Sequence, residues 1–129
     1  MKTISNLFYF SLTLLFFILN LASYSYATGN VDWVLLKENN DGKEWIDMGS
    51  IKEVNAEEIT VLTKFFKNPK ESSNKGQLSL YVMQINCNNK TFKDTSINGI
   101  PQFGSKWQTS NNDELIDVVI EKSCSERVN

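Results

Sequence analysis

Two cysteines, Cys87 and Cys124, are the only ones in this 129-residue chain, and both lie well after an N-terminal segment typical of an export signal. In an oxidising compartment such a pair most simply forms one disulfide. Two buried free thiols are the alternative, which suits a cytosolic protein better. Closing the loop between the cysteines would stabilise the folded state by about 4 kcal/mol, because a cross-link lowers the entropy of the unfolded chain. We therefore expect a small domain whose fold brings these two positions together.

The export signal is expected to cover residues 1–27. It has a cationic start at Met1-Lys2, an apolar run from Leu7 to Leu19 and small residues up to Ala27, a pattern that predicts cleavage after Ala27. The apolar run is shorter than the roughly 20 residues that a helix needs to cross a bilayer, so a retained anchor is the weaker alternative. No cysteine stands directly after the run to accept a lipid. We expect a mature protein without a stable membrane anchor in the periplasm, at the cell surface or in the medium.

Residues 28–129 are enough for one domain with a modest core and too few for two. The full chain carries 13 basic and 15 acidic side chains and no histidine. A mildly acidic domain is a poor general binder of polyanions, so nucleic acid is disfavoured as a partner. The lack of histidine removes the usual catalytic triads and the zinc-binding helix motif, and no glycine-rich phosphate loop is present. The sequence therefore predicts no catalytic residue, cofactor or metal.

Short apolar segments between turn formers predict mainly β structure. A first strand is expected at Trp33-Val34-Leu35-Leu36 and a second at 44–48, joined by a turn at 39–42 in which Gly42 would take a positive φ. Residues 59–66 and 78–87 predict two longer strands, and the second of these is expected at the centre of the sheet because both of its faces begin apolar. A further strand is expected around Thr91-Phe92, followed by irregular structure as far as Trp107.

The C-terminal segment changes to the spacing of a helix. Its apolar residues recur at helical intervals, at Leu115, Ile116, Val119 and Ile120. An amphipathic helix is predicted from about Asp113 to Ser123, with Asn112 as its N-cap and Cys124 at its end. The expected fold class is α+β: a small antiparallel β-sheet with a C-terminal amphipathic helix, pinned by one disulfide.

Two groups of charged residues are candidate binding surfaces. Four acidic residues lie on one side of the predicted helix and could hold Ca²⁺ weakly or meet a basic partner: Asp113, Glu114, Asp117 and Glu121. The solvated side of an amphipathic helix explains them more simply, because no calcium-loop spacing is present. Four lysines in and beside the expected exposed loop 67–76 could contact acidic ligands: Lys64, Lys67, Lys70 and Lys75. A soluble hairpin tip is the simpler interpretation of this group.

The tryptophans and one serine complete the candidates. Trp33 and Trp107 are expected in the core, whereas Trp45 alternates with charged neighbours and is left open as an anchor for a partner. Ser50 follows a strand but lacks the glycine pattern of a nucleophile elbow, so we expect it in a turn.

Three stretches together resemble the bacterial surface-adhesin protein E family: the hairpin from Lys37 to Ile51, the strand from Ser79 to Cys87, and the ending from Trp107 through Cys124. The most telling pieces are an aromatic-apolar-Asp step followed by Ser-Ile, a cysteine that closes a long strand, and a second cysteine just after a C-terminal helix. The resemblance covers nearly all of residues 28–129. It implies an antiparallel sheet flanked by a helix, a Cys87–Cys124 bridge and a non-enzymatic role. The family's namesake role is attachment of Gram-negative bacteria to host matrix and serum proteins such as vitronectin and laminin.

Two features depart from the adhesin-type members. The lipid-acceptor cysteine is absent, and the segment around the first cysteine is less basic, with Asn86, Lys90 and Lys93. The expected function is a non-catalytic exported binding module for a host matrix or serum protein, with its ligand contacts unknown. The alternative is a periplasmic structural or assembly-accessory protein of the cell envelope that pairs through a sheet edge.

Overall fold

The computed structural model describes residues 30–70 and 75–127. The expected signal peptide and its cleavage point after Ala27 lie outside these residues, as does part of the predicted loop 67–76. Within the described part, no helix combines the length and the apolar character that a membrane span requires. The division into a signal peptide and a domain over 28–129 therefore stays a prediction.

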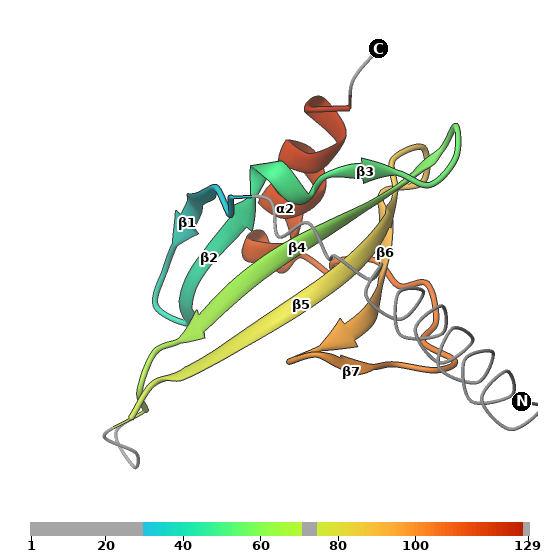
Figure 1. The fold of residues 1–129 in the computed structure, drawn as a ribbon. Helices are drawn as coiled ribbons and strands as arrows, with labels where there is room; N and C mark the ends of the chain where they lie inside the picture. The colour runs from blue at the N-terminus through green and yellow to red at the C-terminus, as the bar shows by residue number, and fades with distance from the viewer. Residues whose placement is uncertain (1–29, 71–74, 128–129) are drawn as a thin grey trace, which may run out of the picture.

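An antiparallel sheet and a C-terminal helix form the described part of the chain (Figure 1). The strands are β1 (Trp33–Glu38), β2 (Gly42–Asp47), β3 (Lys52–Glu53), β4 (Glu58–Lys67), β5 (Gln77–Asn86), β6 (Thr91–Ile97) and β7 (Ile100–Pro101). They pair in the order β1-β2-β4-β5-β6-β7, and β3 pairs with β4. A short 3-10 helix, η1 (Met48–Ser50), follows β2, and α2 (Glu114–Ser125) ends the fold. The predicted α+β class is confirmed.

The long strands β4 and β5 form the centre of the sheet, as the sequence predicts for β5. In β4 the buried residues alternate along the strand, at Ile59, Val61 and Thr63, because successive side chains of a strand point to opposite faces. β5 pairs with β4 on one side and with β6 on the other. Its second apolar face is nevertheless uncovered, since Leu78 is 56% and Leu80 38% exposed.

The turn between β1 and β2 is formed differently from the prediction. The side-chain oxygen of Asn39 accepts hydrogen bonds from the backbone N–H groups of Asp41 and Gly42, at 2.9 and 3.1 Å. Gly42 does not have a positive φ and begins β2 instead. A Cβ atom at this position would lie 2.2 Å from the carbonyl oxygen of Phe66. Glycine is needed here for close strand packing rather than for the turn.

Regular structure continues past Phe92, where the sequence analysis expected an irregular stretch. β6 runs to Ile97, and an Asn98-Gly99 turn with φ of 50° and 80° leads into β7. Positive φ at both central residues of a two-residue turn is typical of a tight hairpin. The Asn-Gly step was therefore a hairpin signal that the prediction missed.

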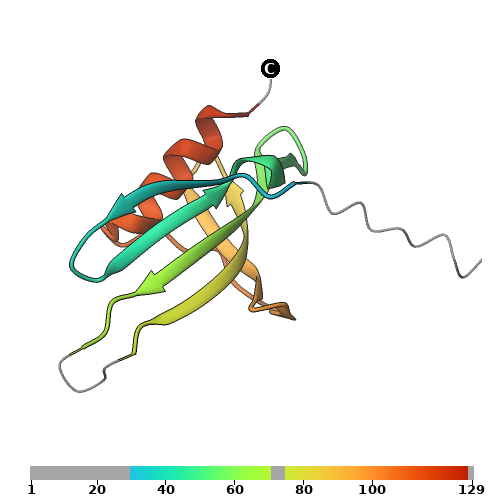
Figure 2. The same ribbon diagram turned by 60° about the vertical axis from the view of Figure 1, so that its left-hand side comes forward.

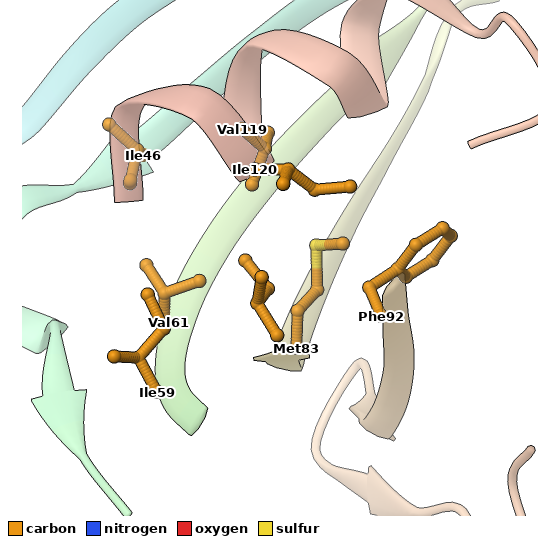
Figure 3. Close-up of a cluster of buried hydrophobic side chains, with 8 residues drawn as sticks. Ile46, Ile59, Val61, Met83, Phe92, Val119 and Ile120 are labelled. Atoms are coloured by element: carbon orange, nitrogen blue, oxygen red, sulfur yellow. The ribbon is translucent and has the colours of Figure 1, made fainter. Parts of the chain in front are cut away.

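The helix α2 lies across one face of the sheet (Figures 1 and 2) and contacts β1, β2 and β4. Its N-cap is Asp113, not the predicted Asn112: the Asp113 carboxylate accepts from the backbone N–H groups of Leu115 and Ile116. Apolar residues of the helix and the sheet pack together between the two layers and form the core (Figure 3). The core residues are Ile46, Ile59, Val61, Met83, Ile85, Phe92, Val119 and Ile120. Burial of this apolar surface is the main force that holds the helix to the sheet.

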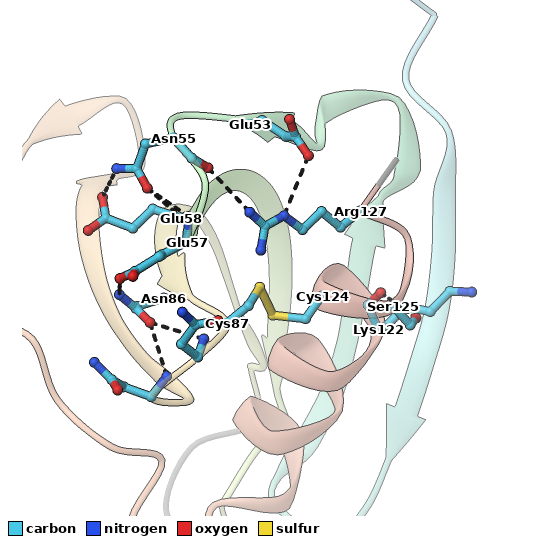
Figure 4. Close-up of a disulfide and its surroundings, with 12 residues drawn as sticks. Glu53, Asn55, Glu57, Glu58, Asn86, Cys87, Lys122, Cys124, Ser125 and Arg127 are labelled. Atoms are coloured by element: carbon cyan, nitrogen blue, oxygen red, sulfur yellow. Dashed lines mark hydrogen bonds and ion pairs between the residues drawn. A yellow bond between two sulfur atoms is a disulfide. The ribbon is translucent and has the colours of Figure 1, made fainter. Parts of the chain in front are cut away.

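A disulfide between Cys87 and Cys124 joins the end of β5 to the last turn of α2 (Figure 4). Neighbouring polar contacts close the same end of the domain. The Asn86 side chain accepts from the backbone N–H groups of Asn88 and Asn89, which shapes the turn after Cys87. Arg127 pairs with Glu53 at 3.4 Å, so β3 is also tied to the C-terminal segment. The disulfide thus links the helix to the central strand.

Candidate functional site

The face of the sheet opposite α2 presents a row of side chains that crosses four strands. Leu35, Trp45, Lys64 and Leu80 are successive register partners across β1, β2, β4 and β5. Register partners project from the same face of a sheet. Because the next residue along β2, Ile46, is buried under the helix, Trp45 and its row must point the other way. A second row, Lys43, Phe66 and Leu78, runs parallel to it. We call the surface formed by these two rows together with Trp33 the open face.

Two tryptophans and a lysine form the polar-aromatic part of the open face. The Lys64 Nζ atom lies 4.5 Å from the ring centroid of Trp33 and 4.7 Å from that of Trp45. Both distances are within the range of cation–π attraction. The lysine therefore holds the two rings in place and adds a positive charge to a surface that is otherwise mainly apolar.

Trp33 and Trp107 are more accessible than their predicted place in the core implies. Trp33, predicted in the core, is only half-buried and lies on the open face. Trp107 was also predicted in the core, which is wrong: it is 40% exposed, and Lys93 lies over its ring at 4.7 Å. The segment after β7 returns along β6, where Gln108 pairs with Phe92, so Trp107 lies at the edge of the sheet and stays accessible.

Of the charged residues singled out in the sequence, Lys67, Lys70 and Asp113 line one cavity, and the others are spread over the structure. Lys64 is part of β4 rather than of a hairpin tip. On the helix, Asp113 is the N-cap and Glu114 pairs with Lys37 at 2.7 Å, while Asp117 is exposed. Among the residues that the structure describes, no group of three or more acidic, cysteine or histidine side chains is placed to hold a metal.

Ser50 has a structural role, in line with the predicted turn. Its Oγ donates to the Asp47 carbonyl at 2.7 Å and accepts from the Leu62 backbone N–H at 2.8 Å. Because the hydroxyl both donates and accepts a hydrogen bond, it fixes η1 against β4.

A cavity of about 420 Å³ lies on the other face of the sheet, beside the N-terminal end of α2. One of the residues that line it is Glu44, which is only 3% exposed. Burial raises the pKa of the Glu44 carboxyl from 4.5 to about 8; a hydrogen bond with Thr63 opposes the rise, and the charges of Asp113 and Asp94 add to it. Glu44 was not among the residues predicted from the sequence. Its spacing of two from the core residue Ile46 was the available signal, because residues two apart on a strand share a face.

Comparison with known proteins places the chain in a family. The model of the surface adhesin-E family matches residues 34–129. The searches of curated proteins and of solved structures returned no significant match.

Proposed function

Because this chain belongs to the surface adhesin-E family, we propose that it is an exported protein-binding module that contacts its partner through the open face. Family membership supports a surface adhesin-like, binding role. The proposed partners are host matrix or serum proteins, with vitronectin and laminin as the first candidates. The proposed compartment is the surface of a Gram-negative cell or its surroundings, reached through the predicted signal peptide.

The observation that carries this proposal is the accessibility of large apolar side chains on the open face. Leu35 is 48% exposed, Leu78 56% and Leu80 38%, and the half-buried rings of Trp33 and Trp45 adjoin them. Contiguous apolar surface on a small domain is typical of an interaction site. Tryptophan is also the side chain most enriched at energetically important interface positions.

Pairing through a sheet edge, the basis of the periplasmic alternative, has less support from the described strands. β1 carries an irregularity between Leu35 and Lys37, and it ends in charged residues. At the other edge, β7 has only two residues, one of which is Pro101. Bulges, charges, short strands and proline all oppose the addition of another strand.

Binding to immobilised vitronectin and laminin, measured by surface plasmon resonance, tests the proposal. The informative variant is Leu35→Asp combined with Leu78→Asp, since both side chains are about half exposed and their loss should cost the fold little. The matched control is Ile100→Asp, which changes a side chain that is 66% exposed on β7, outside the open face. We expect the double variant to lose at least about tenfold in affinity, as removal of an interface anchor does, while the control binds like wild type.

Two results would contradict this proposal. The first is that the wild-type protein binds neither ligand above background, which would remove these partners. The second is equal binding by the double variant and the control, which would move the contact away from the open face.

Location is tested separately by protease treatment of intact producing cells and by mass spectrometry of the mature N-terminus. A protein that starts at Thr28 and is cleaved on intact cells agrees with a surface role. A protein that is protected until the outer membrane is opened would favour the periplasmic alternative instead.

A further inference from the structure

The cavity beside the N-terminal end of α2 is separate from the open face, because it lies on the opposite side of the sheet. Its volume of about 420 Å³ falls within the usual range of small-molecule sites, about 300 to 1,000 Å³. The cavity is lined by apolar and aromatic side chains and by polar groups, which include four carboxyl groups. The carboxyl groups are those of Asp41, Glu44, Asp94 and Asp113.

Glu44 is the most deeply buried of these carboxyl groups. It is 3% exposed, and the adjoining Thr63 and Met83 are each 1% exposed, so it belongs to the floor of the cavity. The Thr63 hydroxyl beside it donates to the Met83 sulfur at 3.8 Å. No ion pair between described residues includes Glu44. An ionised carboxylate in such a place normally has a cationic partner, because a buried unpaired charge is very unfavourable.

The charged and titratable groups around Glu44 do not supply that cation. The strands place Lys37 of β1, Lys67 of β4, Tyr81 of β5 and Asp94 of β6 on the same side of the sheet as Glu44. The other groups around Glu44 are Asp113, just before α2, and Asp41 and Lys70 in the adjoining turns. Lys37 pairs with Glu114, and Lys67 and Lys70 are exposed. The near charges that act on Glu44 are those of Asp113 and Asp94, both negative.

We propose that this cavity binds an alkylammonium group, meaning a primary ammonium on a short aliphatic chain, with Glu44 as the partner of the ammonium. The carboxylate would accept hydrogen bonds from the ammonium on the cavity floor. Phe65, Met83 and Phe92 would cover the aliphatic chain. A bare metal ion suits the cavity less well, because no described group of three or more ligating side chains is placed to coordinate one and because a metal would leave the apolar walls unused.

The ligand chemistry has two possible sources, a free small amine or a lysine side chain of another protein. Isothermal titration calorimetry of the purified protein with n-pentylamine tests the shared chemistry. The matched neutral ligand is 1-pentanol, which has the same chain and no charge. A parallel titration with N-acetyl-lysine methylamide represents the lysine of a protein. Tighter binding of the lysine derivative would identify a protein lysine as the source, and tighter binding of pentylamine a free amine.

The dependence of binding on pH and on Glu44 gives the proposal its sharpest test. Only the ionised carboxyl pairs with an ammonium, and the pKa of Glu44 is about 8 in the ligand-free protein. The apparent affinity for pentylamine should therefore rise about 50-fold from pH 6 to pH 8, in proportion to the ionised fraction. In the Glu44→Gln variant both the affinity and this pH dependence should be lost. The control variant Glu121→Gln, which changes an exposed helix residue outside the cavity, should behave like wild type.

The outcomes separate clearly. The proposal holds if pentylamine binds at least tenfold more tightly than pentanol at pH 8 and if Glu44→Gln removes that preference. It is overturned if no amine binds at millimolar concentration, if pentanol binds equally well, or if the correctly folded Glu44→Gln variant keeps wild-type affinity. Binding to vitronectin or laminin through the open face can fail without affecting this result, since the two surfaces are distinct.

Discussion

Replacement of Glu44 by glutamine is expected to change how the stability of this domain depends on pH. The wild-type carboxyl is buried, and its pKa in the folded protein is about 8 against an ordinary value of 4.5. Between these two values the unfolded chain has lost the proton of Glu44 while the folded protein still keeps it. The contribution of Glu44 to stability is therefore greatest below pH 4.5, falls as the pH rises toward 8, and levels off above that pH.

The size of the effect follows from the shift in pKa. One pKa unit corresponds to about 1.4 kcal/mol. Because of Glu44, the unfolding free energy of the wild-type protein should therefore be about 3 kcal/mol lower at pH 7 than at acidic pH. Glutamine fills nearly the same volume and does not ionise. The stability of Glu44→Gln relative to wild type should therefore increase by about 3 kcal/mol between pH 4 and pH 7.

Urea denaturation of the wild-type, Glu44→Gln and Glu121→Gln proteins at several values between pH 4 and pH 8.5 measures this difference. Burial also raises the pKa of Asp94, but Asp94 is present in all three proteins, so its contribution largely cancels in the comparison. If the difference between Glu44→Gln and wild type stays constant to within about 0.5 kcal/mol over this range, Glu44 ionises normally in the folded state, and our account of its burial is refuted.

Three further changes test other parts of the fold. Reduction of the disulfide, which spans 37 residues, should lower the unfolding free energy by about 4 kcal/mol in urea titrations with and without reductant; equal midpoints would contradict this. Gly42→Ala should cost about 2 kcal/mol or more because its Cβ would meet the backbone of Phe66, whereas Gly49→Ala, with its nearest contact at 3.4 Å, should change the thermal midpoint little. Asp113→Ala should cost about 1 kcal/mol by loss of the N-cap, while Asn112→Gly, which suits the positive φ there, should be nearly neutral by circular dichroism.

Local patterns in the sequence were sufficient to predict most of the secondary structure. The alternation in β4 and β5 and the helical spacing of Leu115, Ile116, Val119 and Ile120 are short-range signals, and each reflects which side of its own element is buried. The two cysteines likewise predicted the link between the central strand and the helix, because a chain with two cysteines has one possible intramolecular pairing. The errors were a turn, a cap, the hairpin from β6 to β7, and the short elements η1 and β3, which were not predicted.

The candidate sites depended on contacts that only the tertiary structure decided. The open face brings Leu35, Trp45, Lys64 and Leu80 together from four strands, and their neighbourhood follows from strand order and register rather than from spacing along the chain. Glu44 looks like an ordinary surface residue of a hairpin until α2 packs on its face of the sheet. The burial and the charge environment of a side chain depend on neighbours that are distant in sequence. The sequence by itself therefore determined the strands and the helix, whereas only their packing decided which side chains are in contact.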